Sequence, residues 1–195
     1  VYHYMNEDDE MILNENPNIQ VGTGYQQIDI LNNTSWRVNE EVFIRLNNQF
    51  STTSNIPRYD NLQDYKDGNL KWSEWSYGPQ TRFMTSLDIN SYNTSRFFDG
   101  NNITLAYQFI EEDRITRKYQ SDEYNNTYID AYVTSLNWDF TLGKLVYGLG
   151  LTHNNILSTA TEGTQTRYPS GGSNLTTAAL YGSYKKEVNE YTICI

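Results

Sequence analysis

The feature that most constrains the fold of this chain is an alternation of apolar and polar side chains with a period of two residues. It is clearest in residues 102–109, where one face carries Ile103, Leu105, Tyr107 and Phe109. Successive side chains of a β-strand point to opposite faces of a sheet, so this pattern predicts a strand with one apolar and one polar face. It recurs in three further stretches, 82–90, 134–140 and 145–152. Helical periodicity is nearly absent, and the chain is therefore predicted to be all-β.

The alternation divides the chain into seven strands and the start of an eighth at Tyr191. We place the seven at 24–36, 42–54, 80–92, 101–115, 127–140, 145–155 and 175–186. Ordinary strands have ~5–6 residues, whereas a tilted strand needs ~9–11 residues to cross a membrane. The predicted strands are therefore long enough to span a bilayer.

The connections between these strands are sorted by length. Short connections are expected at 37–41, 93–100, 141–144 and 187–190, and longer ones at 55–79, 116–126 and 156–174. Because short and long connections alternate, an antiparallel up-and-down meander would bring 1–23 and all the long connections to one edge. Short turns on one side and long loops on the other are typical of outer-membrane β-barrels. We also expect Ile103, Leu105, Tyr107, Phe109, Leu145, Leu149 and Leu151 to share one continuous convex face.

Composition excludes several classes of protein. Apolar runs such as 11–13 are far short of the ~20 residues of a membrane-spanning helix. A net charge of −10 argues against nucleic-acid binding, because no basic stripe is available to contact phosphates. The single cysteine, Cys194, excludes an intrachain disulfide and a cysteine zinc site. The abundant tyrosines, tryptophans and β-branched residues argue against disorder.

Five stretches of the sequence resemble the barrel of TonB-dependent outer-membrane receptors, in the form common in Bacteroidota. They are STTSNIPRYD (51–60), WSYGPQ (75–80), ITLAYQFIEEDRITR (103–117), SLNWDF (135–140) and RYPSGGS (167–173). They follow one another in order and are spread over most of the length between residues 24 and 186. The resemblance implies a 22-stranded barrel, an N-terminal plug domain and energy from the TonB complex of the inner membrane. The usual cargoes of such receptors are ferric siderophores, cobalamin, haem or glycans.

The sequence departs from a complete receptor of this family. It has no plug domain, no TonB box near its start, too few strands to close such a barrel and no barrel-ending strand with a terminal aromatic. It begins at Val1 without a signal-peptide pattern and ends inside a predicted strand. We therefore expect residues 1–195 to be a fragment of the barrel domain, a partial transmembrane β-barrel in the cell outer membrane. Its expected partners are the lipid bilayer, the plug domain, the TonB complex and a small-molecule or glycan ligand.

Aromatic and basic residues in the predicted long loops are the candidates for ligand binding. They are Arg58, Tyr59, Trp72, Trp75, Arg117 and Tyr168. Arginine suits a carboxylate or phosphate, and flat rings stack on sugars or aromatic chelators. The alternative is that these side chains pack loop against loop and close the extracellular mouth.

The two faces of the strands carry further expectations. Polar residues expected to line the lumen are Arg45, Asp88, Gln108, Asn137 and Asp139. Aromatic residues near strand ends are expected to form the two interfacial girdles of a membrane protein: Trp36, Trp138 and Phe140 beside short turns, and Tyr25, Tyr128 and Tyr132 towards the long loops.

We expect neither catalysis nor a cofactor nor a metal. The acidic runs 7–10 and 111–113 lack the spacing of a calcium loop, and no Ser-His-Asp, Cys-His or His-x-x-x-His arrangement exists. Two other architectures remain open. A soluble, secreted β-sandwich, such as a carbohydrate-binding or adhesin module, would need shorter strands shared between two sheets. The other open architecture is a small closed barrel of eight strands.

Overall fold

The computed structural model describes residues 2–92, 95–188 and 191–194. The predicted turns 93–100 and 187–190 therefore fall partly outside the described residues. The elements are β1 (His3–Met5), β2 (Met11–Leu13), β3 (Gln27–Arg37), β4 (Val42–Thr53), β5 (Ile56–Pro57), α1 (Tyr59–Leu62), β6 (Tyr65–Lys66), β7 (Asn69–Leu70), β8 (Trp72–Ser91), β9 (Gly100–Lys118), β10 (Tyr124–Leu142), β11 (Leu145–Ala160), β12 (Ser173–Val188) and β13 (Tyr191–Cys194). Among these residues, no helix is long and apolar enough to cross a membrane.

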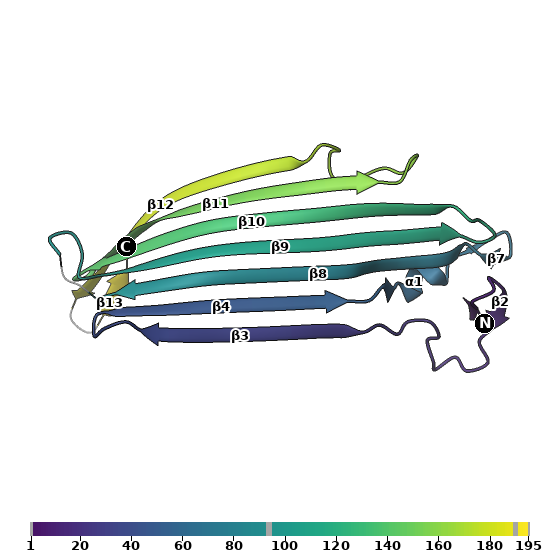
Figure 1. Cartoon of the computed structure of the whole chain (residues 1–195), viewed down its shortest axis with the longest axis horizontal. Helices are drawn as coiled ribbons and strands as arrows, with labels where there is room; N and C mark the ends of the chain where they lie inside the picture. Colours follow the sequence, from purple (N-terminus) through teal and green to yellow (C-terminus); the bar gives the residue numbers. More distant parts are fainter. Residues whose placement is uncertain (1, 93–94, 189–190, 195) are drawn as a thin grey trace.

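Seven long strands and β13 form one antiparallel sheet in the order β13-β12-β11-β10-β9-β8-β4-β3, with short β5 paired to β8 (Figure 1). Each long strand lies beside the next long strand in the sequence, so the sheet is an up-and-down meander. The hairpins β1–β2 and β6–β7 form two separate small sheets. The predicted all-β, antiparallel fold is confirmed, and so are the seven long strands and the strand that begins at Tyr191.

The long connections all leave the sheet at one edge. The segments 54–71, 119–123 and 161–172 lie there, together with α1 and the N-terminal hairpin (Figure 1). The turns 38–41 and 143–144 lie at the opposite edge. We call these the long-loop edge and the short-turn edge. The antiparallel order places each connection at the expected edge. The sorting by length holds for 54–71 and 161–172 but not for 119–123, which is shorter than the connection 92–99 at the short-turn edge.

Several predicted boundaries are wrong, because strands continue into segments expected to be loops. β11, for example, ends at Ala160 and not at 155, so the loop expected at 156–174 is reduced to 161–172. β8 begins at Trp72 and not at 80. Its pairing with β9 continues on both sides of a register shift between Tyr77 and Gln80. This irregularity accommodates Pro79, which lacks a backbone N–H, and Gly78, whose φ is +97°. The loop expected at 116–126 is reduced to 119–123, because β9 and β10 keep pairing as far as Arg117 and Tyr124.

The sheet is a single layer. Leu70 is the one buried apolar side chain among the described residues, and the large apolar side chains of the sheet are exposed or half-exposed. Leu105 is 45% exposed and Leu151 43% exposed, for example. No second layer of long strands covers either face in the described part of the chain, so the molecule does not have the two-sheet core of a sandwich.

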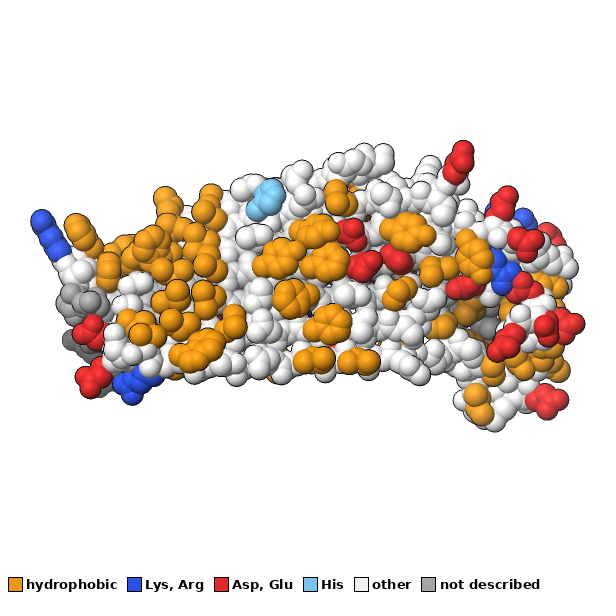
Figure 2. Space-filling model, viewed as in Figure 1, with side chains coloured by type: hydrophobic (Ala, Val, Ile, Leu, Met, Phe, Trp, Pro, Cys, Tyr) orange, Lys and Arg blue, Asp and Glu red, His pale blue; other side chains and the backbone are white. Residues whose placement is uncertain are grey.

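One face of the sheet, the apolar face, carries rows of paired apolar residues. One row is Trp36–Ile44–Ile89–Ile103–Trp138–Leu149–Leu180. The next row towards the long loops contains Leu46–Leu87–Leu105–Leu136–Leu151. Figure 2 shows the apolar side chains gathered over the short-turn half of this face. Register therefore confirms that Ile103, Leu105, Tyr107, Phe109, Leu145, Leu149 and Leu151 share a face.

Aromatic side chains mark both ends of the apolar rows. Near the short-turn edge, the rings of Trp138 and Phe140 are 4.8 Å apart, and Phe140 stacks on Tyr147 at 5.1 Å. Towards the long loops, four paired residues form a row: Phe50–Phe83–Phe109–Tyr132. Six residues of β10 separate Trp138 from Tyr132, which is roughly 20 Å along the strand.

The opposite face, the polar face, carries a hydrogen-bonded network across β3, β4, β8 and β9. Asn33 Nδ2 donates to Asn47 Oδ1 at 2.7 Å, and Asn47 Nδ2 donates to Asp88 Oδ2 at 3.1 Å. Thr104 Oγ1 donates to Asp88 Oδ1 at 2.7 Å. The residues expected to line a lumen, Arg45, Asp88, Gln108, Asn137 and Asp139, all lie on this face.

Candidate functional site

Two of the predicted ligand-binding residues, Arg58 and Trp75, meet at the long-loop end of the polar face. Trp75 and Tyr77 are two residues apart on β8 and so point to the same side. Their rings make an edge-to-face contact with centroids 5.0 Å apart. We call Arg58, Trp75, Tyr77, Glu112, Arg114 and Arg167 the Tyr77 cluster.

Arg58 reaches this pair of rings from the loop that follows β4. Its backbone N donates to the carbonyl of Trp75 at 2.9 Å. Its guanidinium carbon lies 5.4 Å from the Trp75 ring and 5.5 Å from the Tyr77 ring, within cation–π range. Asp60 accepts two hydrogen bonds from the same guanidinium, Nε to Oδ1 at 2.9 Å and Nη2 to Oδ2 at 2.5 Å. These hydrogen bonds lower the pKa of Asp60 and raise the pKa of Arg58.

Arg167 reaches the same ring from a different loop. It lies in 161–172, the connection after β11, and its guanidinium carbon is 6.0 Å from the Tyr77 ring of β8. Its Nη1 is 3.5 Å from Glu112 Oε1, and Glu112 Oε2 accepts a hydrogen bond from Gln80 Nε2 at 2.6 Å. The loop therefore folds back over the polar face, past β10 and β9.

Arg114 completes the cluster from within the sheet. It is the direct cross-strand partner of Tyr77, which places their Cβ atoms within ~5.5 Å of each other. Its Nε is buried and has no hydrogen-bond partner among the described residues. Two guanidinium groups thus lie against the Tyr77 ring, and a third arginine is its cross-strand neighbour, beside the two carboxylates of Asp60 and Glu112.

Arg117, another predicted ligand residue, is instead a structural clamp. Both of its terminal nitrogens donate to the carboxylate of Asp9, Nη2 to Oδ1 at 2.6 Å and Nη1 to Oδ2. Nη1 also donates to the carbonyl of Ser121 at 3.3 Å, and the side chain is 14% exposed. These contacts anchor the N-terminal segment to the end of β9, so the packing interpretation fits Arg117 better than ligand binding.

The N-terminal hairpin is also anchored to the segment 59–70. His3 Nδ1 and the Tyr65 hydroxyl form a hydrogen bond of 2.7 Å, and Gln63 Nε2 donates to the carbonyl of His3 at 2.8 Å. Together with the Arg117–Asp9 pair, these bonds hold residues far apart in the sequence against one another at the long-loop edge.

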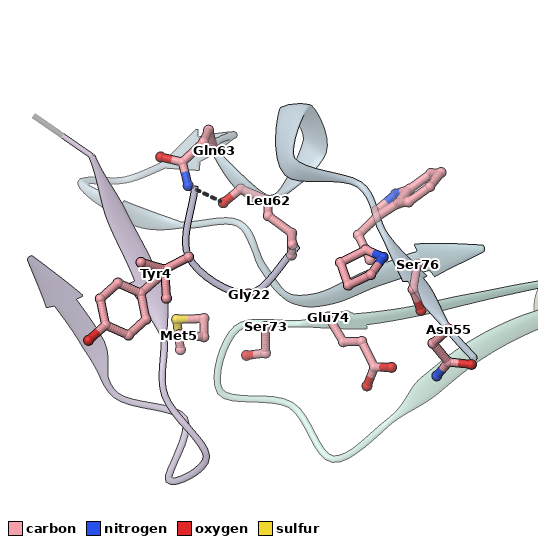
Figure 3. A pocket seen from close by; sticks show the side chains of 12 residues that line it. Tyr4, Met5, Gly22, Asn55, Leu62, Gln63, Ser73, Glu74 and Ser76 are labelled. Carbon is pink, nitrogen blue, oxygen red and sulfur yellow. Dashed lines mark hydrogen bonds between the residues drawn. The ribbon is translucent and has the colours of Figure 1, made fainter. Parts of the chain in front are cut away.

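A cavity of about 160 Å³ lies between this hairpin, α1 and the start of β8 (Figure 3). Its lining includes Met5, Leu62 and Trp75, with Glu74 and Asn55 among the polar groups. Ser76, 2% exposed, lines it with an Oγ that has no hydrogen-bond partner among the described residues. A cavity of about 150 Å³ holds one benzene-sized molecule, so there is room for a single small ring.

The other predicted residues do not join the cluster. Trp72 opens β8, with Lys71 Nζ 4.9 Å from its ring, and Tyr59 begins α1. Tyr168 is 42% exposed in 161–172. Within the described residues, no group of three or more His, Cys, Asp and Glu side chains is arranged to hold a metal ion.

Four members of the cluster were not predicted from the sequence as site residues: Tyr77, Glu112, Arg114 and Arg167. Tyr77 was assigned to a loop, so its shared face with Trp75 was not visible. Glu112 lies in the acidic run 111–113 and Arg114 directly follows it, and that run has no spacing that indicates a binding site. The contact of Arg167 with Tyr77 joins residues 90 positions apart, and no sequence pattern indicates it.

No known protein family, curated protein or solved structure matches the chain.

Proposed function

We propose that this chain is part of the wall of an outer-membrane β-barrel of the TonB-dependent receptor type. Such a receptor takes up a scarce nutrient, namely siderophore-bound iron, cobalamin, haem or a glycan, with energy from the TonB complex. In this proposal the apolar face contacts lipid, and the polar face lines a lumen that the plug domain fills. The long-loop edge is extracellular.

The observation that carries the proposal is the apolar belt on an uncovered sheet, formed by the rows from Trp36 to Leu180 and from Leu46 to Leu151. The second row crosses β4, β8, β9, β10 and β11 without a polar residue. Towards the long loops, the next row of the same face is mostly polar, with Asn48, Thr85 and His153 among its members. The row Phe50–Phe83–Phe109–Tyr132 follows it.

The lower limit of the belt shifts across the sheet. On β11 and β12 it reaches the pair Leu145 and Tyr184, four residues beyond the row that contains Trp36. Strands of membrane barrels are tilted by ~35–45°, so the lipid layer crosses neighbouring strands at different heights, and a shifted limit of this kind fits such an arrangement.

Two further features fit this arrangement. Aromatic side chains border the belt near both edges, where the interfaces of a bilayer would lie. The loops that carry Arg58 and Arg167 bend over the polar face, as loops that narrow the mouth of a barrel would.

The open sheet supports membership in a larger barrel. In the described part of the chain, β3 pairs with β4 on one side only. Lipid cannot form hydrogen bonds with the free backbone groups of such an outermost strand. A membrane-spanning sheet therefore needs further strands that pair with it and close the barrel. The soluble β-sandwich that was the alternative would need a second sheet over the apolar face, supplied from outside the described residues.

Cysteine labelling on intact cells that produce the protein tests the proposed topology. We would replace Cys194 by serine and place single cysteines at Lys66 and Ser170 on the long-loop edge, and at Glu40 on the short-turn edge. A membrane-impermeant thiol reagent should label the first two and leave the third unlabelled until the envelope is broken.

All three positions are exposed in the structure, so a difference in labelling reports on the membrane and not on burial. Equal labelling of all three on intact cells would contradict a membrane-spanning sheet. Labelling of Glu40→Cys alone would reverse the proposed orientation.

A further inference from the structure

We propose that the Tyr77 cluster binds an oxyanion of the transported ligand, a carboxylate or phosphate group. This inference rests on the proposed function, because it treats the polar face at the long-loop edge as the ligand's entry. It narrows the cargo to ligands that carry such an anion.

Charge is the first argument. The whole chain has a net charge of −10, yet Tyr77 has two arginines against its ring, Arg58 and Arg167, and a third, Arg114, as its cross-strand neighbour. Asp60 neutralises Arg58, and Glu112 lies beside Arg167. The positive charge left over belongs to Arg114.

The unfilled hydrogen-bonding capacity of Arg114 is the second argument. A guanidinium has five N–H donors, and the buried Nε of Arg114 has no acceptor among the described residues. An unpaired buried donor is costly, whereas a hydrogen bond between a guanidinium and an oxyanion is among the stronger ones in proteins. A carboxylate or phosphate would supply the missing acceptor.

Preorganisation is the third argument. Arg58 is fixed by two hydrogen bonds to Asp60 and by two rings, and Arg114 projects from a strand paired on both sides. Little side-chain freedom would be lost when an anion binds, which favours affinity. The cluster also draws on two loops and two strands, so it forms only in the folded sheet.

Calorimetric titration of the full chain, refolded in detergent micelles, tests the inference with small probes. Succinate and inorganic phosphate are the anions, and succinamide is the neutral analogue of succinate. We expect at least one anion to bind, to bind more weakly as salt is raised, and to bind at least about tenfold more tightly than succinamide.

Substitutions assign the binding to the cluster. Arg114→Gln should weaken anion binding by about tenfold or more, and Arg114→Lys, which keeps the charge, should restore part of it. Arg96→Gln is the matched control, because Arg96 lies in the turn between β8 and β9 at the other edge. Near-ultraviolet circular dichroism verifies that each variant keeps the native fold.

Equal affinity for succinate and succinamide would overturn the inference, and so would equal losses in Arg114→Gln and Arg96→Gln. Its failure is distinguishable from failure of the proposed function, because the cysteine labelling above depends on topology alone and involves none of the cluster residues.

Discussion

Gly148 shows how a single residue is fixed by its neighbours on the polar face. It lies between Asp139 and Tyr181 in register, and the Tyr181 hydroxyl donates a hydrogen bond to Asp139 across it. A Cβ at this position would lie 2.5 Å from the carbonyl oxygen of Trp138 and 2.7 Å from the Tyr181 hydroxyl. Only glycine at this position leaves room for the Tyr181 side chain to pass over β11 and reach Asp139.

The substitution Gly148→Ala should destabilise the folded chain by about 1–3 kcal/mol, because the backbone oxygen of Trp138 cannot move away as a flexible side chain could. Urea titration in detergent measures the effect. Gly182→Ala is the control, since its Cβ would make only ordinary contacts at 3.9 Å or more. Equal free energies of unfolding in the two variants would contradict the close approach of Trp138 and Tyr181 to Gly148.

The Asp9–Arg117 pair gives a prediction about pH. The hydrogen bond from Arg117 lowers the pKa of Asp9 below 3.8, so the pair stabilises the docked hairpin at neutral pH. This contribution should be lost as the pH falls below 3.8 and through the lowered pKa. Hydrogen exchange of residues 3–13, corrected for its intrinsic pH dependence, should rise there.

Asp9→Asn should show the same rapid exchange already at pH 7, whereas Asp8→Asn, at the exposed neighbouring position, should behave like the native chain. If the hairpin stayed protected in Asp9→Asn, the ion pair would not be what holds it.

At the scale of elements, the alternation of side chains could be predicted from the sequence, because it records side-chain direction within each strand. The residues at which β8 begins and β9 ends could not be predicted in this way. Gly78 and Pro79 normally terminate a strand, and only the register shift against β9 shows that β8 passes through them. The Tyr77 cluster depends on that continuation, which is why the sequence indicated Arg58 and Trp75 but not how they meet.

Gly78 is the residue that permits the irregularity in β8. Its φ of +97° is unfavourable for any side chain, and a Cβ would lie 3.0 Å from the carbonyl oxygen of Ser54. Gly78→Ala should cost at least about 1 kcal/mol and loosen 72–77 while leaving 81–91 protected. Hydrogen exchange resolves the two halves of the strand.

Gly24→Ala is the matched control, since its Cβ would meet open space. Uniform loosening of 72–91 in Gly78→Ala would contradict the division of β8 at the register shift.

At the scale of the whole molecule, a single sheet with an exposed apolar face is unsuited to water. Soluble monomers rarely expose more than a few hundred Å² of contiguous apolar surface, whereas this face carries many exposed large apolar side chains in adjacent rows. The chain produced alone should therefore form inclusion bodies and require detergent to stay dispersed. Size-exclusion chromatography with and without detergent measures this. A monodisperse monomer in plain buffer, with a sharp cooperative melt, would instead favour the soluble alternative.

The most direct test of the central claim is a spin-label scan of β9 in envelope membranes of cells that produce the protein. Single nitroxides at each position from 102 to 109 are exposed to oxygen, which enters lipid, and to a water-soluble nickel chelate. We predict frequent collisions with oxygen and rare collisions with the nickel chelate at Ile103, Leu105, Tyr107 and Phe109. At the four alternate positions we do not expect this combination of collision rates. Collision rates without a period of two, or nickel access at Leu105 equal to that at Ala106, would contradict a lipid-facing sheet.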